Sequence, residues 1–230
     1  MNIQGLQKLT LLDFPGKTAC TVFTAGCDLR CPFCHNASLV IRPPKESEIS
    51  DEELFAFLEK RKGVLDGVAI TGGEPLMQPD IKEFIIKVRS LGYVIKLDTN
   101  GTYPKKLKEL VEEKLVDYVA MDVKAAPSGY PPAVGIGGYK LDKIKESVDF
   151  LLSNAVDYEF RTTVTRELNP VESADELGKF IKGAKRHFLQ QFRDSGEIIG
   201  FGLSAHSKED MLLMRDILRT YVQSCELRGV

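Results

Sequence analysis

Three cysteines lie close together near the amino terminus, at Cys27, Cys31 and Cys34. Thiolates are soft ligands that favour iron–sulfur clusters, zinc or Cu(I). Three closely spaced thiolates can hold three corners of a four-iron cluster and leave the fourth iron open to substrate. A zinc site normally needs a fourth ligand, and His35 directly follows Cys34, which makes shared tetrahedral ligation awkward. We therefore favour an iron–sulfur cluster over a Cys3His zinc site or three buried thiols.

The two other cysteines, Cys20 and Cys225, lie in a strand candidate and near the carboxyl terminus, and we expect them to be packing or surface residues. An odd total disfavours a pure disulfide framework, and a clustered triad is typical of a metal site in a reducing compartment. The sequence has neither a long apolar span nor a basic segment followed by an apolar one at its start. We therefore expect no transmembrane helix, no signal peptide and a cytoplasmic location.

The chain alternates between short strand-like runs and helical periodicity, and these elements must position the thiols. Ser50 and Glu53 have the spacing of a capping box, which predicts a helix start. The pattern predicts about six strand–helix units, which form a parallel sheet with helices packed on it. Six is fewer than the eight of a closed barrel, so an open partial barrel and a doubly wound sheet both fit. The strand candidates are residues 19–23, 68–71, 94–98, 118–122, 158–164 and 198–203, and the helical stripes lie at 54–58, 81–91, 107–111, 141–151, 177–188 and 213–221.

The bulk composition sets limits on the fold and on the partners. A length of 230 residues suits one α/β domain, so we expect a single domain over residues 1–230. Hydrophobic residues at 43% and charged residues at 28% are typical of a globular protein. The net charge of −2 gives no electrostatic reason to expect nucleic acid or a membrane surface as a partner. Loops rich in proline or glycine are expected at residues 43–44 and 127–138.

Polar residues and glycines gather just after the strand candidates. The carboxyl ends of parallel strands form the active-site face of α/β folds, so one site could collect all of these groups. In chain order they are the three cysteines, Gly72-Gly73-Glu74-Pro75, Asp98-Thr99-Asn100-Gly101, Asp122 and Lys124, then Arg161 within its strand and His206.

The cysteine spacing C-x3-C-x2-C resembles the signature of the radical S-adenosylmethionine (SAM) superfamily. Gly72-Gly73-Glu74-Pro75, about one βα unit later, resembles that family's GGE-type motif. The resemblance implies a partial, open parallel β/α barrel of the radical SAM type. It also implies a [4Fe-4S] cluster on Cys27, Cys31 and Cys34, with SAM on the open iron and reductive cleavage to a 5′-deoxyadenosyl radical. No catalytic residue beyond the cluster and SAM is then expected.

A narrower resemblance is to the glycyl-radical-enzyme activases. It rests on Asp13-Phe14-Pro15-Gly16, Gly26-Cys27, Cys34-His35-Asn36, Asp98-Thr99-Asn100-Gly101 and Met121-Asp122-Val123-Lys124. The resemblance implies a glycyl radical enzyme as the partner, either anaerobic ribonucleotide reductase or pyruvate formate-lyase. It implies flavodoxin or ferredoxin as the electron donor. Loops 13–17 and 127–138 are candidates for docking the partner.

The residues expected around SAM have plausible structural roles as well. Glu74 could be a solvated loop carboxylate and Asn36 a helix cap. Arg161 could bind the SAM carboxylate or form a structural ion pair with Glu159 or another carboxylate. The cofactor-binding set that we expect is His35, Asn36, Gly72, Gly73, Glu74, Asp98, Asp122, Lys124, Arg161 and His206.

A cation beside SAM is a further alternative that the sequence leaves open. Asp98 and Asp122 end neighbouring strand candidates. Two carboxylates together could bind a hard monovalent or divalent cation, or Lys124 could neutralise them.

Two other functions stay open at this stage. One is a small-molecule radical SAM enzyme such as 7-carboxy-7-deazaguanine synthase, which acts on a pterin-like substrate and usually needs magnesium. The segments 35–36 and 122–124 favour the activases over it. The other is a non-catalytic zinc-binding protein, which would have no use for the Gly72–Pro75 motif.

Overall fold

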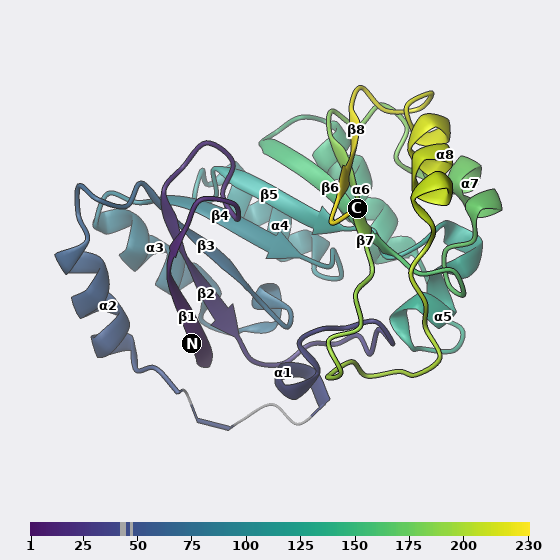
Figure 1. Ribbon diagram of the computed structural model, residues 1–230. Coiled ribbons are helices and arrows are strands. Elements are labelled where there is room, and N and C mark those ends of the chain that lie inside the picture. Colours follow the sequence, from purple (N-terminus) through teal and green to yellow (C-terminus); the bar gives the residue numbers. More distant parts are fainter. Residues whose placement is uncertain (42–44, 47) are drawn as a thin grey trace.

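A computed structural model describes residues 1–41, 45–46 and 48–230, and Figure 1 shows its ribbon. One eight-stranded sheet runs through it, and the strands lie side by side in chain order, from purple β1 to yellow β8. β1 pairs with β2 in the antiparallel sense, and every later pair is parallel. The strands are β1 Ile3–Thr10, β2 Ala19–Thr24, β3 Gly67–Gly72, β4 Val94–Thr99, β5 Tyr118–Asp122, β6 Asp157–Val164, β7 His187–Gln191 and β8 Cys225–Arg228. With β1 and β8 as its two ends, this is the partial open barrel that the sequence predicts.

Helices join the parallel strands. The capping box at the start of α2 is confirmed, because the Glu53 amide donates to the Ser50 hydroxyl and the Ser50 amide donates to the Glu53 carboxylate. The α-helices are α1 Ala37–Ile41, α2 Asp51–Lys60, α3 Ile81–Ser90, α4 Pro104–Glu112, α5 Tyr130–Val134, α6 Asp142–Leu152, α7 Ala174–Phe180 and α8 Lys208–Leu218, with 3-10 turns η1 Pro75–Met77, η2 Pro127–Gly129 and η3 Val171–Ser173. In the described part of the chain, no helix has the length and apolar character that a membrane crossing requires.

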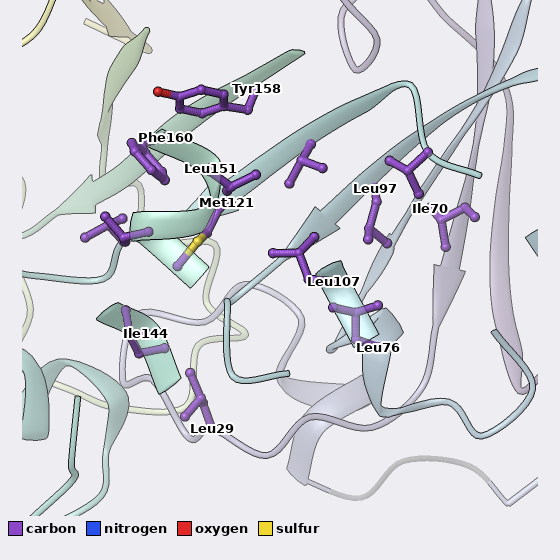
Figure 2. Close-up of a cluster of buried hydrophobic side chains, with 14 of the residues drawn as sticks. Leu29, Ile70, Leu76, Leu97, Leu107, Met121, Ile144, Leu151, Tyr158 and Phe160 are labelled. Atoms are coloured by element: carbon purple, nitrogen blue, oxygen red, sulfur yellow. The ribbon is translucent and has the colours of Figure 1, made fainter. Parts of the chain in front are cut away.

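The main hydrophobic core lies between one face of the sheet and these helices. Figure 2 shows Ile70, Leu97 and Met121 of adjacent strands next to Leu107 and Ile144 of the helices. These side chains are fully buried, and each contributes roughly 1.5–3 kcal/mol by leaving water. Because side chains alternate along a strand, the other face of the sheet carries a different set of residues. That inner face is polar, and it includes Lys96, Asp98, Asp122, Glu159 and Arg161.

One predicted strand is wrong. Residues 198–203 form an irregular segment, and the strand after β6 is β7, His187–Gln191. Phe188 matches the helical stripe that starts at Leu177, but α7 ends at Phe180 and Phe188 belongs to β7. The strand candidates also do not include β1 and β8. The expected loop at Pro43–Pro44 lies outside the described residues, and the one at 127–138 holds η2 and α5.

Candidate functional site

A cavity of about 260 Å³ opens at the carboxyl ends of the parallel strands. Residues from five of the strand ends and from the cysteine loop meet there, as expected for this type of sheet. Eleven of the thirteen residues that the sequence analysis assigned to the site line this cavity. They are Cys27, Cys31, Cys34, His35, Asn36, Gly72, Gly73, Asp98, Asp122, Lys124 and Arg161.

The cysteine loop joins β2 to α1 and turns its sulfur atoms toward the cavity. The Leu29 amide donates to the Cys27 sulfur at 3.4 Å, and the Asn100 side-chain amide approaches the same sulfur at 3.6 Å. The Cys34 amide donates to the Cys31 carbonyl at 3.0 Å, which closes the loop around the triad. N–H groups aimed at sulfur stabilise a thiolate, so these two groups favour the ionised form of Cys27.

Burial makes the free thiolates costly. It raises the pKa of Cys27 to about 11 and the pKa of Cys31 to about 12, although Lys124 lowers both. Such thiols ionise when a cation binds them, because metal binding displaces the proton. In the described part of the chain, no three His, Cys, Asp or Glu side chains converge closely enough to hold one metal ion. Thiolates are soft ligands of the kind that iron–sulfur clusters take, so the three-thiol donor set fits a cluster.

The loop after β3 is tied to the cysteine loop through its backbone. The Gly73 amide donates to the Thr24 carbonyl at 2.9 Å, and the Glu74 amide donates to the Gly26 carbonyl at 2.8 Å. A Cβ atom on Gly73 would lie 1.9 Å from the Gly26 oxygen. Gly72 has φ +123°, in a region that side chains rarely permit. The two glycines are therefore required for the contact between the loops, whatever else they bind.

Glu74 is buried and lies outside the cavity lining, so it is not the solvated carboxylate that the sequence left open. Its two oxygens accept hydrogen bonds from the Leu76 amide, the Thr99 hydroxyl and the Asn100 amide, at 2.7–3.0 Å. Burial raises its pKa to about 7, against these hydrogen bonds, which lower it. Glu74 therefore connects the loop after β3 to the end of β4, where Asn100 faces the cysteines.

This pKa shift gives a testable pH dependence in the cluster-free protein. The Glu74 pKa is about 7 when folded and about 4.5 when unfolded. The folded state therefore binds the proton more tightly. The resulting stabilisation is complete below pH 4.5, is lost as the pH rises through 7, and amounts to about 3 kcal/mol. Glu74→Gln removes the titration. In urea unfolding, we expect the free energy of unfolding of the wild type to fall by roughly this amount, relative to that of Glu74→Gln, from pH 5 to pH 8. Parallel stability curves across this range would contradict the shift.

Five charged side chains form an alternating row at the cavity, and all of them except Lys96 line it. Lys96 pairs with Asp98 Oδ1, and Arg161 Nη1 lies 3.1 Å from Asp98 Oδ2. Arg161 Nε lies 2.9 Å from Asp122 Oδ1, and Lys124 Nζ lies 3.0 Å from Asp122 Oδ2. Three cations and two anions leave an excess of one positive charge. Arg161 thus pairs with the two aspartates, whereas Glu159 pairs with Arg228.

The row keeps both of its aspartates ionised at neutral pH. Burial alone would raise the pKa of both aspartates, but Arg161 and the neighbouring lysines outweigh it and hold each pKa below its ordinary value. Burial would lower the pKa of Lys124 and Arg161, but the anionic groups around them, Asp122 foremost, together outweigh it and raise both pKa values. A wall of fixed charges with a positive excess suits an anionic group of a bound ligand.

The structure places the three remaining candidates differently. His35 is exposed, with its ring 5.9 Å from the Phe192 ring. The Asn36 side-chain amide donates to the Gly72 carbonyl at 2.9 Å, which holds the loop after β3. His206 does not reach the cavity, because its Nε2 atom lies 2.9 Å from the Asn169 carbonyl oxygen. Asn169 in turn donates to the Lys124 carbonyl at 3.1 Å. His206 thus lies behind the site.

Several residues at the site were not in the predicted set. Thr99 and Asn100 line the cavity, and their motif after β4 could have identified them. Gln190 and Thr163 also line it and are joined by a hydrogen bond of 3.1 Å. Gln190 was missed because β7 was misplaced. Lys96 was missed because it lies mid-strand, where a lysine alone gives no signal.

The two candidate docking loops lie at opposite ends of the strands. The loop at 13–17 is not beside the cavity: Phe14 packs with Ala19 and Tyr118, at the amino ends of β2 and β5. The segment 127–138 does reach the cysteine loop, where the Arg30 amide donates to the Val134 carbonyl at 2.9 Å. The segment after β7 also reaches it, through the Gly200 amide and the Pro32 carbonyl at 2.7 Å. In Figure 1 this segment passes beside the cysteine loop and α1.

Comparison with known proteins agrees with this geometry. A family model described as the radical SAM superfamily matches residues 21–182. A protein of Methanocaldococcus jannaschii, named as a candidate glycyl-radical enzyme activating enzyme, is 32% identical over 99% of this chain and 96% of its own. Pyruvate formate-lyase-activating enzyme of Clostridium pasteurianum is 31% identical over 64% of this chain and 63% of its own. 7-Carboxy-7-deazaguanine synthase of Methanopyrus kandleri is 32% identical over 50% of this chain and 53% of its own.

Among solved structures, Streptococcus suis SuiB bound to the precursor peptide SuiA has a similar fold. The TM-score is 0.71 at 16% identity, over 91% of this chain and 48% of that one. At this identity the likeness concerns the fold alone, and it supports the partial open barrel.

Proposed function

Since this chain belongs to the radical SAM superfamily, we propose that it is an activase that generates a glycyl radical on a partner enzyme. The main support is the full-length similarity to a relative named for that activity. The partner would be anaerobic ribonucleotide reductase or pyruvate formate-lyase, as the motifs in the sequence suggest. Residues 1–230 would act as one radical SAM domain, since the sheet is continuous from β1 to β8.

In this proposal the cysteine triad holds a [4Fe-4S] cluster, and SAM occupies the cavity beside it. When bound, the cluster and SAM together supply the 5′-deoxyadenosyl radical, so the protein's task is to bind, orient and exclude water. The loop at Gly72 and Gly73, the exposed His35 and the half-buried Asn36 would border SAM. Arg161 and Lys124 would attract its carboxylate, because the charged row has a positive excess.

Two of the predicted cofactor residues would act indirectly. Glu74 would hold Thr99 and Asn100 in place, since its carboxylate accepts hydrogen bonds from the Thr99 hydroxyl and the Asn100 amide. His206 would support Lys124 through Asn169. Neither is proposed to touch SAM.

The partner's glycine must enter the cavity for a hydrogen atom to be removed. Glycine suits this reaction, because it has no side chain and flanking amides stabilise its radical. Of the two loops considered for docking, the segment 127–138 is the better candidate, since it contacts the cysteine loop beside the cavity. The electron would come from flavodoxin or ferredoxin, and the reduced thiols suit a cytoplasmic location.

The decisive experiment uses the anaerobic, cluster-loaded protein with SAM, a reductant and a glycyl radical enzyme. We expect stoichiometric 5′-deoxyadenosine and a glycine-centred EPR signal on the partner. Partner protein made with α-deuterated glycine should transfer deuterium into 5′-deoxyadenosine. A partner whose radical-site glycine is replaced by alanine is the matched control, and it should give neither the signal nor the label. Deuterium transfer from neither candidate partner would contradict the proposed targets.

A second candidate function is supported by the similarity to 7-carboxy-7-deazaguanine synthase over half of the chain. Such an enzyme would act on a pterin-like molecule without a protein partner. Turnover of a carboxypterin by the isolated protein would favour this function over the activase.

A further inference from the structure

The two aspartates at the cavity wall have the ligand type that hard cations prefer. Their oxygens, however, already have partners within the protein. Each of the four carboxylate oxygens of Asp98 and Asp122 faces a different nitrogen, contributed by Lys96, Arg161 and Lys124. Every carboxylate oxygen of the two aspartates therefore already has a nitrogen partner from a lysine or arginine.

A hard cation needs a shell of several oxygen ligands, six to eight for calcium and six for magnesium. At this wall it would have to displace a lysine or arginine from a carboxylate and then lie a few ångströms from three positive charges. Like charges at such short range repel one another even in partly solvated surroundings. The row thus disfavours a metal cation at Asp98 and Asp122.

Lys96 is the member of the row that has no other evident role. It lies on β4 and is only 2% exposed, and it does not line the cavity. A buried lysine is costly unless it is paired, and its partner here is Asp98. Because β4 side chains alternate, Lys96 is on the same inner face as Asp98, directly behind it.

We propose that Lys96 is a positioning residue that replaces a metal cation: its ammonium group holds Asp98 and makes SAM binding independent of added cations. The proposal rests on the SAM-binding part of the proposed function but not on the identity of the partner. It departs from the alternative that Asp98 and Asp122 hold a cation beside SAM. It also separates this chain from an enzyme that needs magnesium.

The first test measures SAM affinity of the cluster-loaded, anaerobic protein at constant ionic strength. Sodium, potassium and magnesium are replaced by choline after treatment with a chelator. We expect the wild-type Kd to change less than about twofold. The melting temperature of the cluster-free protein should likewise be the same in all four salts. A loss of SAM affinity of tenfold or more in choline, or a stoichiometric cation retained through gel filtration, would overturn the proposal.

The second test uses Lys96→Met, which keeps an unbranched side chain one atom shorter and removes its charge. We expect SAM to bind at least about tenfold more weakly in choline and to recover on addition of sodium or potassium. Lys96→Arg should stay independent of cations. Lys108→Met is the matched control, because Lys108 is a half-exposed lysine paired with Glu146 outside the cavity. Weakening that no cation relieves would show a structural role only and would contradict the proposal. If Lys96→Met does not fold, Lys96→Gln replaces it, and the wild-type measurement still decides.

Neither test can be confused with failure of the proposed function. A wild type that needs cations but still cleaves SAM would overturn the role of Lys96 and leave the activase untouched. A wild type that binds SAM without cations but gives no glycyl radical would contradict the activase function and leave the role of Lys96 untouched.

Discussion

Cys31→Ala is expected to abolish the formation of 5′-deoxyadenosine, with a fall of more than about 100-fold, since removing even an outer-shell partner of a metal ligand costs 10–100-fold. Cys31 is buried in the middle of the triad, and burial raises the pKa of its thiol to about 12. A thiol with so high a pKa stays protonated at neutral pH unless a metal displaces the proton. The measurements are iron and sulfide content after anaerobic reconstitution, and 5′-deoxyadenosine after reduction with SAM.

The matched control for this variant is Cys20→Ala. Cys20 is also fully buried, but it lies within β2 and does not line the cavity. We expect it to keep the cluster and the activity while losing roughly 1 kcal/mol of stability from the small void. A Cys31→Ala protein that still binds four irons and cleaves SAM would contradict the assignment of the triad. Equal losses in both variants would point to misfolding instead.

Gly73→Ala is expected to have the second largest effect. The new Cβ atom would lie 1.9 Å from the Gly26 carbonyl oxygen and 3.3 Å from the Cys27 amide, so backbone must move. Forcing atoms into a packed contact typically costs about 1–3 kcal/mol. Here the movement falls on the residue that precedes the first cysteine. We expect a lower melting temperature, reduced cluster content and at least about a tenfold loss of SAM cleavage per iron.

Gly137→Ala gives the comparison for Gly73→Ala. It is the same substitution in a loop near the same face, and its Cβ would meet no atom within 4 Å. This variant should match wild type in stability and cluster content. If Gly73→Ala behaved like Gly137→Ala, the contact between the two loops would not be needed to shape the site.

The sequence predicts most of the sheet and the chemical groups at its edge, and its failures have physical causes. The cysteine spacing and the Gly72–Pro75 motif identify two loops because their residue types are unusual at that spacing. The strand β7 was not predicted because only two of its residues, Phe188 and Leu189, are apolar, and Phe188 also fits the preceding helical period. Residues 198–203 imitate a strand, but they contain two glycines and lie against Pro32.

The pairing among charged residues was harder to foresee than their presence. Asp98, Asp122 and Lys124 are visible at or just after predicted strand ends and Arg161 within a predicted strand, but which cation meets which oxygen depends on sheet register. Asp122 lies opposite Arg161 in the β5–β6 register, which explains that contact. Lys96 belongs to the charged row only because side chains alternate along β4, which puts it on the inner face with Asp98. His206 follows no strand end, since the strand assigned before it does not exist.

The chain-order sheet has a consequence for how the protein is made. Each strand pairs with the one synthesised just before it, so a chain emerging from the ribosome can extend the sheet one strand at a time. The cysteine loop and the loop after β3 are complete within the first third of synthesis. Arg161 and Gln190, which form the opposite wall of the cavity, follow much later. The loop that carries the three thiols can therefore form before the strands that contribute Arg161 and Gln190 to the cavity are synthesised.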